Sequence, residues 1–243
     1  MIGWRNRTSL VIGILAGLLA ASVQAEGHDQ SDWYGQKWRD RLLEGVNGDK
    51  HVEWRFVEAD GPGGFPIGDG KRLRVEDGAV EWNPPPATMG FHRDDATYPS
   101  LNFENCSSTQ SNQGDYQKNR IGWQSAGDTD ELARMAPCTF ESEPDTLYSF
   151  KIRVNSQIAP NWWSGTGMTP SNEYDLWSAM AHEFGHATGF YNGLRHHWPE
   201  ADSEGLCPEG VNRHTMCPGL IPGTIMMRNL EEHDSHTYNN AYP

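Results

Sequence analysis

The segment from Ala181 to Phe190, AHEFGHATGF, constrains this chain more than any other, because it places three chemically demanding side chains close together. An α-helix turns by roughly 100° per residue, so His182 and His186 lie about 40° apart on one helix face, one turn apart along the axis. Both imidazoles can therefore reach the same ion. Zinc accepts such nitrogens at about 2.0–2.1 Å, and Glu183 can take a proton from a water in the remaining position. The segment predicts a zinc site with its own general base.

The residues around this segment predict how the helix begins and ends. Apolar side chains recur at three- and four-residue spacing, which is typical of a helix with one buried face: Leu176, Ala179, Met180 and Phe184. We expect Ser171 or Asn172 to cap the helix start. Glu173 and Asp175 would then lie in its first turn, where the helix dipole favours acidic groups. Gly189 would end the helix in a left-handed conformation.

These residues resemble a known family. HEFGHATGF is similar to the H-E-x-x-H-x-x-G helix of the metzincin zinc metalloendopeptidases, and it looks most like the matrixin branch in its bacterial, secreted form. The resemblance implies an enzyme that hydrolyses peptide bonds by a zinc-bound water activated by Glu183. In that pattern the glycine turns the chain sharply, and the third metal ligand follows three residues later.

Asn192 stands where that pattern has its third ligand, so we expect a displaced histidine to complete the site. We favour His197, because its place before Trp198 resembles the histidine-aromatic pair that follows the helix in bacterial matrixin-like sequences. His196 is the alternative, since adjacent residues generally point apart and only one of the two should bind.

Two alternatives use the same helix differently. In one, a glutamate about twenty residues downstream is the third zinc ligand, and Glu200 or Glu204 would serve. In the other, the chain is an inactive secreted binding module on a metzincin scaffold, which lost activity with the third ligand. Asn192 favours that module, whereas the retained Glu183 argues against it.

A second motif favours the metzincin assignment over the downstream glutamate. HTMCPG, residues 214–219, resembles the methionine turn of matrixins, with Met216 below the zinc and Met226 and Met227 as rival methionines. The resemblance covers about residues 50–243 and implies an α+β fold. We therefore expect a metzincin-like catalytic domain: a twisted, mostly parallel β-sheet packed on a long zinc-binding helix, with a C-terminal helix after the Met-turn.

Hydrophobic patterning places the other elements. It predicts strands at residues 51–57, 101–103, 120–125, 131–136 and 147–155, and helices at 71–83 and 225–241. The pattern of residues 131–136 is ambiguous between a strand and a helix. The apolar face of the first helix would comprise Leu73, Val75, Val80 and Trp82. By the family resemblance, a peptide substrate should lie extended along an edge strand near residues 131–136.

The first residues predict export. Arg5 and Arg7 precede an apolar run from Leu10 to Ala21, and small residues at Val23 and Ala25 suit cleavage after Ala25. We expect residues 1–25 to be a signal peptide, 26–49 an N-terminal arm or short pro-segment, and 50–243 the protease domain. The apolar run is too short to span a bilayer comfortably, so we expect a secreted, extracellular chain without a membrane association after signal removal.

The net charge of the chain limits the classes of molecule that we expect it to bind. Removing residues 1–25 deletes two arginines and leaves 17 basic against 33 acidic residues, a net charge of −16. Such a surface repels nucleic acid and anionic membranes. We expect a monomer whose partner is a protein or peptide substrate.

The four cysteines predict disulfides in an exported chain, since no C-x-x-C spacing favours metal ligation. Proximity in the sequence favours the pairs Cys106–Cys138 and Cys207–Cys217. The family resemblance also implies structural Ca2+, but we assign it no residues. Acidic loops are usually solvated, and we assign no metal to His92 with Asp94 and Asp95.

Overall fold

The strand β7 (Glu143–Asn155) is thirteen residues long and pairs with more strands than any other described strand except β3, which it equals with three partners. All its side chains from Leu147 to Asn155 are buried, so both faces of the sheet are covered there. The computed structural model describes residues 37–38, 44–46, 49–58, 64–65, 69–83, 89–101, 103, 119–127, 131–140, 143–189, 215–216, 219–225 and 227–242.

The fold is α+β with a mostly parallel sheet, as predicted. The other strands are β1 (Lys37–Trp38), β2 (Glu44–Val46), β3 (Asp49–Phe56), β4 (Met89–Arg93), β5 (Arg120–Gln124), β6 (Ala133–Phe140), β8 (Trp162–Trp163) and β9 (Tyr174–Asp175). The helices are α1 (Gly70–Val80), α2 (Leu176–Ala187), α3 (Glu232–Ala241) and the 3-10 helix η4 (Ser156–Asn161).

Parallel pairing joins β4 to β3, β3 to β5, and β5 to β7. The strand β6 runs antiparallel to β7 and has no second partner among the described strands. The short strands β1 and β2 pair with β7 and β3.

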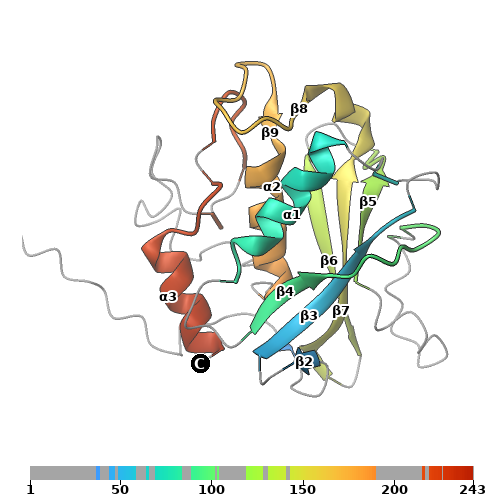
Figure 1. Ribbon diagram of the computed structural model, residues 1–243, viewed down its shortest axis with the longest axis vertical. Helices are drawn as coiled ribbons and strands as arrows, with labels where there is room; N and C mark the ends of the chain where they lie inside the picture. Colours follow the sequence, from blue (N-terminus) through green and yellow to red (C-terminus); the bar gives the residue numbers. More distant parts are fainter. Residues whose placement is uncertain are drawn as a thin grey trace, which may run out of the picture.

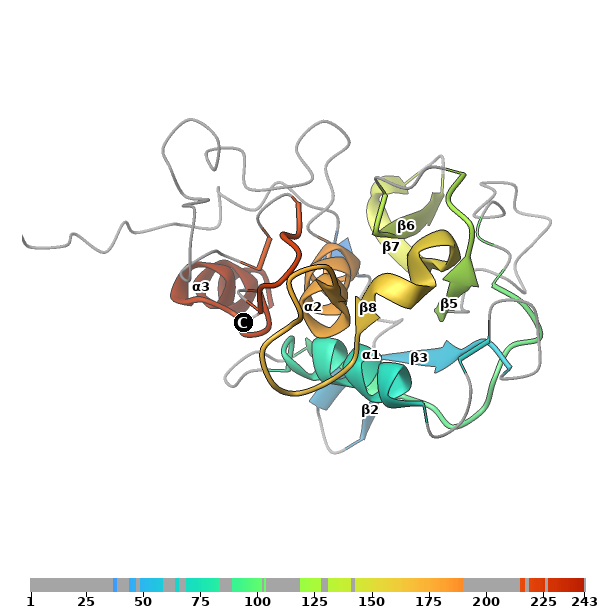
Figure 2. The same cartoon turned by 90° about the horizontal axis from the view of Figure 1, so that it is seen from above.

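The helices α1 and α2 lie side by side against one face of the sheet, and α3 lies beyond α2 (Figures 1 and 2). The ring of Phe184 on α2 lies 5.3 Å from the ring of Trp54 and 5.0 Å from that of Phe91, so the helix packs on β3 and β4. The two helices approach closely at Gly78, where an added Cβ would lie 2.6 Å from the Met180 side chain. The apolar period predicted for α2 thus faces the core.

Four of the five predicted strands are confirmed, as β3, β5, β6 and β7. The prediction of a strand at 101–103 is wrong for the two residues described there. Leu101 and Phe103 instead pack with Val57 in a second, smaller apolar cluster. The strand β4 was not predicted; it is only five residues long and contains a glycine.

Three helix predictions need correction. The helix α2 begins at Leu176, with Asp175 as its N-cap instead of Ser171 or Asn172, because the preceding Tyr174 and Asp175 pair as β9 with β8. On α1, Val75 is buried as expected, but Leu73 and Val80 are 53% and 62% exposed. The last helix begins at Glu232, seven residues later than predicted.

Residues in the segment expected to be an N-terminal arm or short pro-segment contribute to the fold. Trp38 on β1 is buried in the main core, and the expected boundary between residues 49 and 50 lies within β3. No helix in the described part of the chain is long and apolar enough to cross a membrane.

Candidate active site

The helix α2 brings His182 and His186 together. Their Nε2 atoms are 3.1 Å apart, and the two rings are nearly perpendicular, at 89°. Two nitrogens that bind one zinc ion at about 2.0–2.1 Å in tetrahedral geometry are about 3.3 Å apart. The same separation lets His186 donate a hydrogen bond to His182 when no ion is bound. The pair therefore fits zinc without any change of the helix.

The outer nitrogen of His182 is held by the turn that contains Met216. Its Nδ1 donates a hydrogen bond of 2.8 Å to the backbone carbonyl of Thr215, which leaves the lone pair of the neutral ring on Nε2. Thr215 is itself fixed, since its N–H donates to Asp234 Oδ2 at 2.9 Å and its hydroxyl to the Asn229 carbonyl at 2.9 Å. A carbonyl partner of this kind orients a ligand histidine. Sequence reasoning missed the roles of Thr215 and Asp234, because each is engaged with a backbone group: the Thr215 carbonyl holds His182, and the Asp234 carboxylate accepts from the Thr215 backbone N–H.

Glu183 lies between α2 and the edge strand β6. Its Oε2 accepts a hydrogen bond of 2.5 Å from the backbone N–H of Met135. Burial raises the pKa of Glu183 to about 8, and the Met135 hydrogen bond partly opposes this shift. A carboxyl group with a pKa in this range is suited to accept and return a proton near neutral pH. The predicted base is therefore tied to the strand predicted to bind substrate.

Met216 packs directly below the helix. It is fully buried, and an added Cβ at Gly185 would lie 2.1 Å from its sulfur and 2.6 Å from the Trp82 ring. Trp82 is held in place because its Nε1 donates a hydrogen bond of 2.6 Å to the Ala181 carbonyl. The glycine inside HEFGH therefore makes room for the methionine predicted beneath the site. The rival Met227 is also buried, and Met226 lies outside the described residues.

The helix ends as its glycine predicts. Gly189 has φ of +113°, and its N–H donates to the His186 carbonyl at 2.9 Å. The predicted third ligands and their rivals lie outside the described residues: Asn192, His196, His197, Glu200 and Glu204. The choice between His197 and His196 therefore stays a prediction.

The cysteines are described at one position only. Cys138 on β6 is buried and disulfide-bonded. Cys106, Cys207 and Cys217 lie outside the described residues, so both predicted pairings stay predictions.

Comparison with known proteins identifies no family for this chain. No known protein-family model matches the chain, and a search of characterised proteins finds no matching sequence.

Proposed function

We propose that this chain is a secreted zinc-dependent endopeptidase of metzincin type. His182, His186 and His197 would bind zinc, with His196 as the alternative third ligand, and Glu183 would be the general base. The observation that carries the proposal is the pair of Nε2 atoms 3.1 Å apart, with one ring oriented by the Thr215 carbonyl. The Thr215 carbonyl selects the tautomer of His182 that has its lone pair on Nε2, which is the form that can bind a metal ion.

Zinc, when bound, would supply a Lewis acid that lowers the pKa of water and polarises a carbonyl group. The task of Glu183 is to hold the proton taken from the water and to return it to the leaving amine. Because Oε2 is held by the Met135 amide, the carboxylate keeps one orientation through both transfers. Met216 supports the helix from below and does not take part in proton transfer.

The substrate would lie along β6, the edge strand. Met135 pairs with Ile152 of β7, but its N–H points to Glu183, so its carbonyl also faces away from β7. Pro137, two residues on, faces the same side and has no N–H to donate. The free edge therefore presents carbonyl acceptors, and we expect an extended peptide to bind with its own N–H groups toward them.

The test uses the mature chain, residues 26–243. We expect it to bind zinc and to cleave a denatured protein substrate, and a chelator should abolish cleavage. Glu183→Ala should retain zinc and lose about 10²–10⁴-fold in kcat/KM, the usual contribution of a general base. Glu173→Ala, a control on the loop before the helix, should keep full activity.

The ligand assignment is tested with the same proteins. His197→Ala should lose both zinc and cleavage, while His196→Ala should keep both. If His196→Ala loses zinc and His197→Ala keeps it, His196 is the third ligand instead of His197. A wild-type chain that binds zinc but cleaves nothing across a broad peptide library would overturn the proposed activity.

A further inference from the structure

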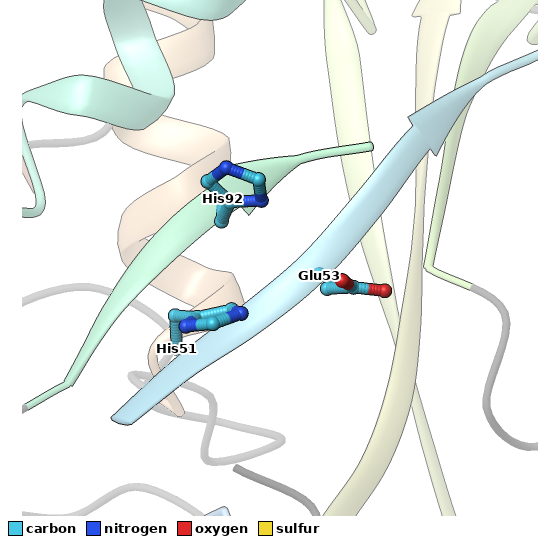
Figure 3. Close-up of side chains that lie close together, drawn as sticks. All are labelled: His51, Glu53 and His92. Carbon is cyan, nitrogen blue, oxygen red and sulfur yellow. The ribbon is translucent and has the colours of Figure 1, made fainter. Parts of the chain in front are cut away.

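The outer face of β3 and β4 gathers three side chains that are common metal ligands. One ligand atom of each of His51, Glu53 and His92 lies within 4.8 Å of the other two (Figure 3). The register of the two parallel strands sets Glu53 opposite His92, and His51 is two residues earlier on the same face of β3. The rings of the two histidines are 5.2 Å apart. Two strands that are separate in sequence thus place three potential metal ligands close together.

This cluster is separate from the histidine pair on α2. Val52 and Trp54 alternate with the cluster residues along β3, and both are buried, with the Trp54 ring packed on Phe184 of α2. His51 and Glu53 therefore point away from α2, on the opposite face of the sheet. No residue of the cluster can share an ion with His182 and His186.

The arginines on these strands are already engaged by other carboxylates. Arg55 pairs with Asp94, and Arg93 pairs with Asp95 at 2.8 Å. Within the described part of the chain, the carboxylate of Glu53 and the ring nitrogens of His51 and His92 make no hydrogen bond or ion pair. Asp94 and Asp95, the neighbours of His92 in sequence, are thus occupied, and the nearby potential ligands come from β3 instead.

We propose that His51, Glu53 and His92 bind a divalent transition-metal ion, with Zn2+ as the expected one. Two imidazole nitrogens and one carboxylate oxygen suit zinc, whereas Ca2+ and Mg2+ prefer oxygen ligands alone. The ligand atoms must close from at most 4.8 Å to about 3.3 Å, which side-chain rotation achieves because His51 and Glu53 are partly exposed and His92 is exposed. The ion would join β3 to β4 across a sheet face that α1 and α2 do not cover.

The experiment counts zinc in the whole mature chain. Chelator-stripped protein at tens of micromolar is titrated with zinc chloride alone against a competing indicator, for wild type, His92→Ala, Glu53→Gln, Glu58→Gln and His186→Ala. Wild type should bind two equivalents, and His92→Ala should bind one, with at least a 100-fold loss of affinity at the missing site. Glu53→Gln should weaken the same site, whereas Glu58→Gln, the same change at an exposed position beyond the end of β3, should leave two equivalents.

The titration distinguishes failure of the cluster proposal from failure of the proposed active site. One outcome is that the wild type binds one equivalent of zinc that His92→Ala loses and His186→Ala keeps. That result would support the metal site at the cluster and would overturn the proposed catalytic zinc site. Equal stoichiometry in wild type and His92→Ala would overturn the cluster, whatever His186→Ala shows. As a second readout, zinc should raise the unfolding temperature of His186→Ala and should not raise that of His92→Ala/His186→Ala. If zinc has the same effect on both variants, the cluster proposal is also overturned.

Discussion

At the scale of single residues, the helix motif is as much a packing motif as a chemical one. Four positions serve the site or its support: His182 and His186 face each other, Glu183 contacts β6, and Gly185 gives way to Met216. The spacing of the two histidines follows from helix geometry. The glycine between them follows from what lies under the helix, since Met216 and Trp82 are fully buried there and a Cβ at Gly185 would overlap both.

Gly185→Ala should destabilise the protein by overpacking. The new Cβ would meet the Met216 sulfur at 2.1 Å and the Trp82 ring at 2.6 Å, and the hydrogen bond from Trp82 to Ala181 limits its retreat. We expect a loss of about 1–3 kcal/mol in the free energy of unfolding. Urea denaturation of the chelator-stripped protein measures it. Gly167→Ala is the matched control, because its Cβ would meet nothing within 4 Å; equal stability of the two variants would contradict the packing argument.

At the scale of elements, the N-terminus of helix α2 is held by one local contact and one contact that is distant in sequence. At its start, Asp175 accepts hydrogen bonds from the Ser178 backbone N–H at 2.9 Å and hydroxyl at 2.6 Å. The same carboxylate receives two nitrogens of Arg228, at 2.7 and 2.9 Å, and both residues are buried. Arg228 therefore connects the segment after the Met216 turn to the N-terminus of the helix.

Arg228→Met should be strongly destabilising, because it leaves the buried Asp175 carboxylate without its cation. Removing one partner of a buried ion pair costs about 3–5 kcal/mol. The same substitution at Arg93, whose partners Asp95 and Glu76 have side chains that are 89% and 28% exposed, should cost at most about 1 kcal/mol. Denaturant unfolding of the two variants compares them. Asp175→Asn/Arg228→Met should recover part of the loss; if it is no more stable than Arg228→Met, the buried charge is not the cause.

At the scale of the whole molecule, the two ends of the described chain meet at the C-terminus of α2. Trp38 Nε1 donates a hydrogen bond of 2.7 Å to the Ala187 carbonyl, and the Tyr242 hydroxyl donates to that of Thr188. The Tyr242 oxygen also accepts from the Trp38 backbone N–H, across 204 residues of sequence. Burial raises the pKa of Tyr242 well above its ordinary value, so the hydroxyl keeps its proton. These contacts satisfy helix carbonyls that have no partner within the helix.

A chain that begins at residue 50 should therefore fail to fold stably, in contrast to one that begins at residue 26. Trp38→Ala gives the smaller, measurable version of this loss, about 3–5 kcal/mol, since it removes a buried aromatic ring. Trp38→Phe should cost less, because it keeps a ring and loses one hydrogen bond. Circular dichroism during urea titration compares the chain from residue 50, Trp38→Ala and Trp38→Phe with the chain from residue 26. Unchanged stability of the chain from residue 50 would mean that the N-terminal strand is a removable segment.

The sequence by itself determined what depends on local geometry. Helix periodicity placed His182, Glu183 and His186 on α2, alternation and apolar runs located β3, β5 and β7, and the glycine at position 189 marked the helix end. Each of these features depends on residues within a few positions of one another. Such patterns survive folding because one turn of helix or one strand sets them.

Only the tertiary structure decided which distant groups meet. The N-cap of α2 lies at Asp175 and not at Asn172, because Arg228 and β8 hold the chain there. The Thr215 carbonyl reaches His182, and His92 lies opposite Glu53, because the sheet and the closing turn bring separate segments together. Strand register and side-chain contacts across the core depend on the whole chain, so a short segment of sequence does not predict them.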